Sequence, residues 1–380
     1  MKYKLQDIVD VTMGQSPKSE FYNTNGKGVP FLQGNRTFGL KYPTFDTFTT
    51  MVTKEAKAGD VIMSVRAPVG DLNITPVGMC LGRGVCSLRM KNGDQEFLYY
   101  MMKYYMPQLI NKESGTVFGS VNRNDINGLE VDIPNDVVVQ RKISRLLSMF
   151  DEKIQINNRI NNNLLEQALT LYATQFVSLD RNGCIGDYCL IKSGFAFKSS
   201  WWTHTGVKVI KIGSINQDNL NLLECSYVDE DKIDKAKDFR VGAGDLLIAM
   251  TGATIGKFAM VPYSSEILLV NQRVGKFFLG DNPVEKLPFI YCTLKQSEVY
   301  YEIVNRGQGS AQPNISAYDI MSIPCVIPSK EAINDFNDIA QPLFDLIISN
   351  QRENQQLSEL RDSLLPWLMS GEVDISDINL

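Results

Sequence analysis

The feature that most constrains this chain of 380 residues is a long internal repeat. Motifs of the first part recur in the same order in the second part, at an offset that grows from 180 to 194 residues. The matching motifs are Asp7 and Asp187, Gly14-x-x-x-Lys18-Ser19 and Gly194-x-x-x-Lys198-Ser199, Gly59-Asp60 and Gly244-Asp245, and Asp125-Ile126 and Asp319-Ile320. A collinear series of this length indicates two copies of one structural unit, with small loop insertions in the second copy.

Each copy ends in a segment with the pattern of a long helix. From Val139 to Phe176 there is neither Gly nor Pro, and the seam positions follow the alternating spacing of three and four residues that is typical of a coiled coil. These positions are Leu147, Phe150, Ile154, Asn157, Asn161, Leu164, Ala168 and Leu171, and they recur 193 residues later as Ala340, Leu343, Ile347, Asn350, Asn354, Leu357, Arg361 and Leu364.

Two asparagines lie near the middle of each seam, namely Asn157, Asn161, Asn350 and Asn354. Polar seam residues usually set the register and the partner of a coiled coil. The repeated pair predicts an antiparallel helix pair whose central layers are amide against amide. The alternative is two separate amphipathic helices, each of which lies on its own domain.

The rest of each copy has a mixed pattern. Short apolar runs bounded by turn residues predict strands at Asp60–Val65 and Asp245–Met250, and one helix is predicted per copy, at Phe97–Asn111 and Leu287–Asn305. We therefore expect an α+β protein with a pseudo-two-fold internal repeat. Two mixed α/β domains would be separated by two long antiparallel coiled-coil helices of about 55–60 Å, which would place the domains at opposite ends. The expected segments are 1–138, a central helix at 139–178, 179–329, a second helix at 330–370 and a tail at 371–380.

The composition excludes several catalytic chemistries. His204 is the only histidine and the seven cysteines form no Cys-x-x-Cys pair, so the usual zinc sites cannot be assembled. The segment Gly252–Lys257 has three residues between its glycines instead of the four of a phosphate-binding loop, and no Gly-x-Ser-x-Gly motif occurs. The first ten residues, MKYKLQDIVD, hold no apolar segment of the kind found in signal peptides, and no apolar run of about 18 residues occurs, so we expect neither secretion nor a membrane span. These patterns favour a cytoplasmic, non-catalytic binding protein without a metal.

Taken in order, the motifs resemble the specificity (HsdS) subunits of type I restriction–modification systems. The resemblance covers nearly the whole chain. It rests on the two Gly-Asp motifs, on the segments 122–126 and 314–320 that run into Ile-Pro, on the two asparagine-rich helices and on the closing segment 364–373.

The resemblance implies a division of labour within a larger complex. Each globular part would be a target-recognition domain that reads one half of a bipartite double-stranded DNA sequence. The helices would be spacers that dock methyltransferase (HsdM) subunits, two per chain because the repeat offers two similar surfaces, and restriction (HsdR) subunits would join through the methyltransferase. The chain itself would have no catalytic centre and no cofactor, and S-adenosylmethionine, ATP and magnesium would be bound by the partner subunits.

The net charge of −5 is unusual for a DNA-binding protein, because contacts with phosphates require basic residues. Residues 329–380 hold ten acidic and three basic residues, a net charge of −7, whereas residues 1–138 and 179–328 have net charges of +1 and −1. The acidity therefore lies in the last helix and the tail. Near-neutral domains would bind DNA weakly by themselves, which fits partners that supply part of the phosphate contact.

We predict DNA contacts at loop residues that can pair with base edges or phosphates, since Arg and Lys recognise guanine and Asn and Gln recognise adenine. In the first domain they are Gln15, Lys18, Asn35, Arg36, Arg66, Arg83, Ser120, Asn122 and Arg123. In the second they are Lys198, Lys211, Ser214, Asn216, Thr251, Thr254, Arg273, Gln312, Asn314 and Ser316. The pairs Lys18 and Lys198, and Arg83 and Arg273, hold near-equivalent places, which favours phosphate contacts for them because unlike half-sites need unlike base contacts. Trp201 and Trp202 are expected to pack beneath their loop.

Two other functions are compatible with the residues. One is a two-domain DNA-binding regulator that acts without a methyltransferase. The other is a degenerate enzyme, or a single-chain methyltransferase with divergent motifs. Binding of S-adenosylmethionine by the isolated chain would favour the methyltransferase, and co-purification of an adenine methyltransferase would favour the specificity subunit.

Overall fold

The computed structural model describes residues 1–110, 119–307, 313–373 and 375. They form two compact units, one made of Met1–Lys153 and Leu357–Leu380 and the other of Ile154–Gln356. The units cut across the segments expected from the sequence, because each unit includes part of both long helices.

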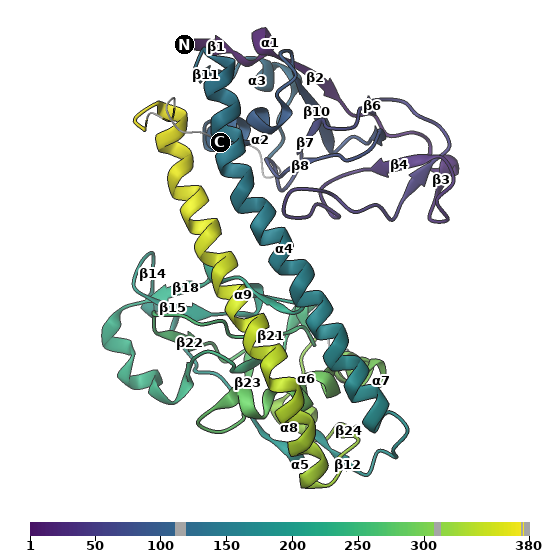
Figure 1. Ribbon diagram of the computed structural model, residues 1–380, viewed down its shortest axis with the longest axis vertical. Coiled ribbons are helices and arrows are strands. Elements are labelled where there is room, and N and C mark those ends of the chain that lie inside the picture. Colours follow the sequence, from purple (N-terminus) through teal and green to yellow (C-terminus); the bar gives the residue numbers. More distant parts are fainter. Residues whose placement is uncertain (111–118, 308–312, 374, 376–380) are drawn as a thin grey trace. The chain divides into compact units, whose positions relative to one another are not determined.

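The first unit holds a four-stranded sheet of order β2-β10-β7-β8 and a five-stranded sheet of order β3-β5-β4-β9-β6, and β1 pairs with β11 (Figure 1). The strands are β1 (Lys2–Lys4), β2 (Val9–Met13), β3 (Tyr22–Asn23), β4 (Val29–Leu32), β5 (Phe48–Thr49), β6 (Glu55–Ala56), β7 (Val61–Ser64), β8 (Leu72–Ile74), β9 (Met79–Leu81), β10 (Val85–Met90) and β11 (Glu130–Asp132). Only the β4–β9 pair among these neighbours is parallel. The strand predicted at Asp60–Val65 is β7, which is buried along its whole length.

The second unit repeats this strand order, with sheets β13-β23-β20-β21 and β14-β18-β15-β22-β19 and the pair β12-β24. Its strands are β12 (Gly183–Cys184), β13 (Leu190–Ser193), β14 (Trp202–Thr203), β15 (Val207–Ile210), β18 (Ser226–Val228), β19 (Arg240–Val241), β20 (Leu246–Ala249), β21 (Phe258–Met260), β22 (Leu268–Val270), β23 (Val274–Phe278) and β24 (Pro324–Cys325). As in the first unit, one pair, β15–β22, is parallel. A hairpin of β16 (Ile215–Asn216) and β17 (Asn219–Leu220) is an addition. The predicted repeat is therefore confirmed. Part of its growing offset comes from the segment after β18, where residues 229–239 stand in place of residues 50–54 of the first unit.

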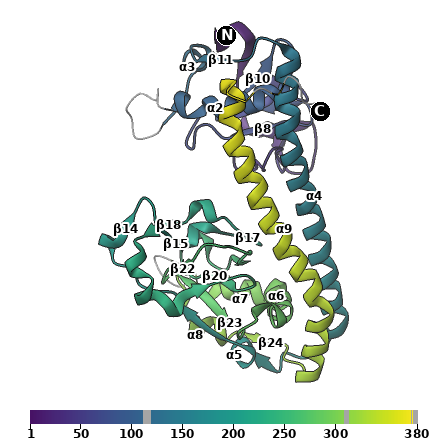
Figure 2. The same ribbon diagram turned by 60° about the vertical axis from the view of Figure 1, so that its left-hand side comes forward.

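A buried helix covers the four-stranded sheet in each unit. In the first it is α2 (Gln95–Ile110), in which Tyr99 and Tyr100 are fully buried. In the second, the helix predicted over Leu287–Asn305 is divided into α6 (Leu287–Lys295) and α7 (Ser297–Gly307), because Gln296 has extended backbone angles of φ −64° and ψ 128°. Figure 2 shows α6 beside α9, and their side chains share one core with the sheet and α4.

The repeated aspartates have structural roles. Asp7, Asp125, Asp187 and Asp319 each accept a hydrogen bond of 2.8–3.2 Å from the backbone N–H three residues earlier. They lie in four short helices: α1 (Leu5–Ile8), α3 (Arg123–Asn127), α5 (Ile185–Tyr188) and α8 (Ala317–Met321). Hydrogen bonds from Cys184 and Ser316 lower the pKa of the Asp187 and Asp319 carboxyls. These motifs recur because they cap helices, which the fold needs in both copies.

The two long helices are α4 (Val137–Phe176) and α9 (Lys330–Ser370). None of the sixteen predicted seam residues is exposed. In the second unit the helices run antiparallel, since Asn157 contacts Asn354 while Asn161 contacts Asn350 (Figure 1). The predicted pairing is confirmed, and the alternative of two separate helices is wrong.

The asparagines of the second unit form two groups of hydrogen-bonded amides across the helix pair. Asn157 Nδ2 donates to Asn354 Oδ1 at 2.9 Å, and Asn350 Nδ2 donates to Asn161 Oδ1 at 2.8 Å. Asn354 Nδ2 in turn donates to Asn158 Oδ1 at 2.9 Å. Buried polar groups must be paired, so a shift of one helix along the other would leave these amides without partners. Setting of the register by these layers remains a prediction.

None of the helices in the described part of the chain combines the length and the apolarity needed to cross a membrane. Within the same residues, no cluster of three or more His, Cys, Asp or Glu side chains has the arrangement of a metal site.

Candidate nucleic-acid interface

In the first unit, the loops after β2 and β7 meet at the turn between β9 and β10. The backbone N–H of Gln15 donates to Leu81 O at 2.9 Å, and that of Val65 donates to Gly84 O at 2.9 Å. Arg66 pairs with Ser120 in an isolated antiparallel bridge. We call this region the first loop edge, and it gathers the predicted contacts Gln15, Arg66, Arg83 and Ser120.

The second unit builds the same arrangement from other residues. The N–H of Phe195 donates to Val270 O at 2.8 Å, and that of Met250 donates to Arg273 O at 3.0 Å. Thr251 pairs with Asn314 in an isolated antiparallel bridge. We call this region the second loop edge, and it gathers the predicted contacts Thr251, Arg273 and Asn314, with Lys211 directly after the neighbouring strand β15.

The repeated glycines Gly14 and Gly194 allow the loops to approach the turn. A Cβ at Gly14 would lie 2.0 Å from Gly82 O, and one at Gly194 would lie 2.4 Å from Val270 O. No larger residue fits at such distances, so these glycines are required by close backbone approach.

The matched hydrogen bonds establish which residues correspond between the two edges. The bond from Val65 to Gly84 corresponds to that from Met250 to Arg273, so the counterpart of Arg273 is Gly84. Arg83 therefore corresponds to Gln272, so the two arginines hold neighbouring places on the edges, one residue apart. Corresponding places on the edges hold different polar side chains, namely Arg66 and Thr251, Ser120 and Asn314, and Arg83 and Gln272. Such differences favour base contacts over shared phosphate contacts at these places.

Lys18 and Lys198 do occupy equivalent places. Each precedes a one-turn 3-10 helix, Ser19–Phe21 or Ser199–Trp201, with nearly identical backbone angles of φ −68° and ψ 145° or φ −70° and ψ 146°. Both residues are exposed, and the Lys18 side chain is 82% accessible. The equivalence of the two lysines in the sequence is confirmed, and it fits the phosphate contact predicted for both.

A group of lysines surrounds a tryptophan beside the second loop edge. The Nζ atoms of Lys198, Lys232 and Lys235 lie 5.7, 5.5 and 5.1 Å from the centre of the Trp201 ring. The Trp201 ring stacks on Phe195 at 6.1 Å between centroids and 12° between planes, which ties the group to the edge. We call these residues the lysine–tryptophan cluster. The sequence reasoning missed Lys232 and Lys235, although the alternation of Lys and Asp over 229–238 was a usable signal of a charged surface loop.

Lys211 has a similar environment. Its Nζ lies 3.5 Å from the centre of the Trp202 ring, and burial lowers the pKa of this ammonium group. Trp202 packs on Phe197 at 5.4 Å between ring centroids. Both tryptophans are thus half-buried against aromatic neighbours, as predicted, and each has a cation at its face.

Several other predicted contacts have partners within the chain. Asn122 and Ser316 cap α3 and α8 through their side-chain oxygens, and Arg123 Nη2 donates to Val11 O at 2.6 Å. Arg36 pairs with Asp46 at 2.8 Å, and Asn35 Nδ2 donates to Asp71 Oδ2 at 2.5 Å. These residues have structural roles, which do not prevent the exposed ones from meeting a ligand.

The remaining predicted contacts are placed as follows. Ser214 is fully buried and its hydroxyl lies 3.2 Å from Glu224 O, which corrects its assignment as a DNA contact. Thr254 Oγ1 donates to Thr251 O at 3.4 Å, and Asn216 is exposed on the added hairpin. Gln312 lies outside the described residues.

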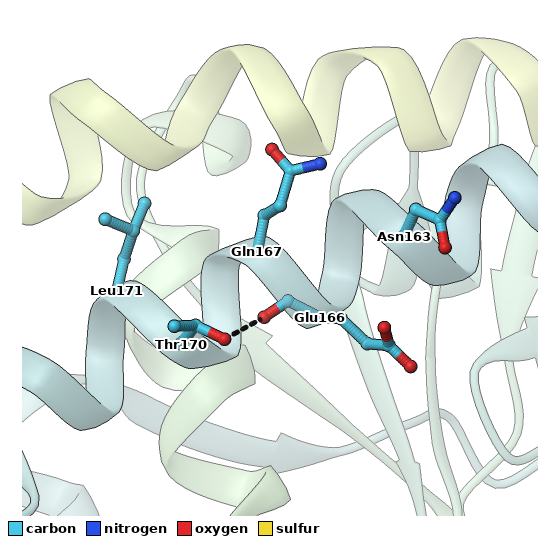
Figure 3. Close-up of a pocket in the computed structure, with 5 residues that line it drawn as sticks. All are labelled: Asn163, Glu166, Gln167, Thr170 and Leu171. Atoms are coloured by element: carbon cyan, nitrogen blue, oxygen red, sulfur yellow. Dashed lines mark hydrogen bonds between the residues drawn. The ribbon is translucent and has the colours of Figure 1, made fainter.

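A shallow hollow of about 570 Å³ lies on α4 in the second unit, lined by Asn163, Glu166, Gln167, Thr170 and Leu171 (Figure 3). Thr170 Oγ1 donates to Glu166 O at 2.8 Å. None of the lining residues is a cation, so the hollow does not fit a phosphate.

Comparisons with known proteins agree with this architecture. The family model of the type I restriction modification DNA specificity domain matches residues 1–166 and 181–361. The putative type I restriction enzyme MjaX specificity subunit of Methanocaldococcus jannaschii is 36% identical over 151 residues, which span 39% of this chain and 35% of that protein. The MjaIX specificity subunit of the same organism is 22% identical, with 99% of this chain and 94% of that protein covered.

Among solved structures, the S subunit of a type I restriction–modification system from M. genitalium superposes with a TM-score of 0.53. The two chains are 18% identical, and the match covers 99% of this chain and 96% of the other, so it supports the fold along the whole length. The chain therefore belongs to the family of type I restriction–modification DNA specificity domains, of which it carries two copies, as its motifs had indicated.

Proposed function

We propose that this chain recognises a bipartite sequence in double-stranded DNA for a type I restriction–modification complex, with each domain contacting one half-site. One observation carries the proposal: the two loop edges share a backbone framework and differ in their polar side chains. Base edges are distinguished by the donors and acceptors that reach them, so one framework with two sets of side chains suits two unlike half-sites.

The basic residues beside the loop edges would contact DNA phosphates, and these contacts do not depend on the DNA sequence. Lys18 and Lys198 hold equivalent places, and the lysine–tryptophan cluster adds cations in the second unit. Phosphate contacts orient a protein on DNA and carry most of its salt dependence. Because the domains are near neutral overall, partner subunits would add to this contact.

Substitution of one arginine in each edge tests the division into half-sites. Arg83→Ala and Arg273→Ala, each in the complex with its methyltransferase, are expected to relax recognition at one base position of one half-site, at a cost of about 1–3 kcal/mol. The two variants should affect opposite halves of the target. The measurement is a map of methylated sites in cells that express each variant. A change in both halves by either single variant, or an unchanged map for both, would contradict the proposal.

The same proposal assigns the long helices to docking of methyltransferase subunits, two per chain. In the second unit, Ile156 and Ile160 of α4 and Ile339 and Leu346 of α9 expose 38–56% of their surface. A partner would cover these apolar side chains. S-adenosylmethionine, ATP and magnesium are assigned to the partner subunits of a cytoplasmic complex, and no catalytic role is proposed for this chain.

Stoichiometry tests this assignment. The repeat presents two similar surfaces, so the complex purified from cells is expected to hold two methyltransferase subunits for each copy of this chain. Native mass spectrometry measures the ratio. A stable complex with a single methyltransferase would count against two equivalent docking surfaces.

A further inference from the structure

One long loop in each unit joins the same two strands of the five-stranded sheet. The first recognition loop, residues 33–47, joins β4 to β5 and carries Asn35 and Arg36. The second recognition loop, residues 211–225, joins β15 to β18 and carries Lys211 and Asn216. Both loops begin where the strands enter the loop edges and then run to the long helices of their own unit.

The first recognition loop is fixed by a buried lysine. The side chain of Lys41 is 4% exposed, and its Nζ donates to Glu96 Oε2 of α2 at 2.6 Å. The same Nζ lies 3.4 Å from Tyr100 Oη and 3.9 Å from Asp151 Oδ2 of α4. Lys41 therefore brings a positive charge from the loop to an acidic site on the helices.

The second recognition loop is fixed by an aspartate. Asp218 lies at the tip of the β16–β17 hairpin with a φ of 65°, and its carboxylate accepts hydrogen bonds from Tyr291 Oη and Lys295 Nζ of α6. Its carbonyl oxygen accepts a hydrogen bond from Gln351 Nε2 of α9 at 3.1 Å. Asp218 therefore brings a negative charge from the loop to a basic site on the helices.

The two contacts have the same construction and opposite polarity. In both, a charged side chain of the loop reaches a fully buried tyrosine on the helix that covers the sheet, Tyr100 or Tyr291. In the first unit the helices supply the carboxylates, and in the second they supply the ammonium group. On the helices of the second unit, Lys41 would lose its carboxylate partner and meet the ammonium group of Lys295, and such a contact between like charges is unfavourable.

We propose that Lys41 and Asp218 are positioning residues for DNA recognition, which hold the two recognition loops on their own helices through ion pairs of opposite polarity. The proposal rests on the proposed function, since it concerns the loops that would meet DNA. Neither residue contacts DNA. Each acts by fixing the loop whose side chains do.

The test uses the complex with its methyltransferase and the variants Lys41→Met and Asp218→Asn. Each is expected to raise methylation at sites with one mismatch in the corresponding half by about tenfold, within the range that one mismatched base pair costs, and to leave the other half unchanged. Lys27→Met and Asp238→Asn are the matched controls, because they remove the same charges from exposed side chains of the same units. The controls should give the wild-type map.

A rescue separates positioning from a general loss of stability. Asp218→Lys should relax the half-site, and addition of Lys295→Asp should restore it, because the ion pair is rebuilt with reversed polarity. If Asp218→Asn fails to fold, Tyr291→Phe removes one donor while it retains the ring, and a relaxed half-site is then expected from that variant. Unchanged half-sites in the folded variants, or equal relaxation of both halves, would overturn the proposal. The methylation maps of Arg83→Ala and Arg273→Ala distinguish failure of the positioning role from failure of the proposed function. If those maps change while the maps of the Lys41 and Asp218 variants do not, only the positioning role is wrong.

Discussion

Replacement of both Lys198 and Lys235 by Gln is expected to weaken the affinity of the complex for every DNA sequence by about 30-fold at physiological salt. Both side chains are exposed at the face of Trp201, beside the second loop edge. If each neutralises one phosphate, their loss should lower the slope of log affinity against log salt by about 1.8, because each contact releases about 0.9 of a counterion. Titration of target and non-target duplexes at several salt concentrations measures both quantities.

A matched pair of lysines provides the control. Lys286 and Lys330 are exposed in the same unit, at the starts of α6 and α9, and their replacement by Gln changes the net charge equally. This variant should keep the wild-type slope. Equal slopes for the two variants would show that the lysine–tryptophan cluster only adds to the overall charge, and loss of affinity for the target alone would assign it to base recognition.

The largest effect on stability is expected at Asp151 of α4. Its side chain is 8% exposed, accepts a hydrogen bond from Tyr100 Oη at 2.5 Å and pairs with Arg361 of α9, which is 13% exposed. Asp151→Ala would remove the buried carboxylate partner of this guanidinium group and leave it only the exposed Asp362 carboxylate at 2.8 Å, so we expect a loss that approaches the cost of about 3–5 kcal/mol for breaking a buried ion pair. Denaturant unfolding of the isolated chain measures the loss, which should appear in the transition of the first unit.

The second unit indicates how that loss can be recovered. The seams of the two copies are related by a shift of 193 residues. By this shift, Phe344 is the counterpart of Asp151 and Ala168 is the counterpart of Arg361, and Phe344 and Ala168 are fully buried. The repeat thus meets one packing requirement with an ion pair in one copy and with apolar side chains in the other. The double variant Asp151→Phe/Arg361→Ala should therefore regain most of the stability, since apolar replacement of a buried ion pair is often neutral or favourable. A double variant as unstable as Asp151→Ala would show that apolar packing cannot replace this ion pair in the first unit.

Much of the candidate site was predictable, because exposed polar residues in turns are visible in a sequence. Arg66, Arg83, Thr251 and Arg273 were selected on that basis, and the structure brings them to two equivalent edges. Ser214 had the same appearance and is buried, because residues 221–225 fold back on it and bring Glu224 O and Cys225 Sγ to its hydroxyl. Whether a loop residue is exposed depends on segments that lie elsewhere in the chain, and no local pattern records it.

The sequence by itself determined the repeat, the strand at Asp60–Val65, the two long helices and the facing asparagines. Each of these follows from periodicity or from side-chain chemistry over a few residues. Only the tertiary structure decided that Lys232 and Lys235 meet Trp201, and that Lys41 and Asp218 bring opposite charges to their helices. These facts join residues that lie far apart in the chain. Hydrogen-bond register and burial fix them, and both arise only when the strands and helices have packed together.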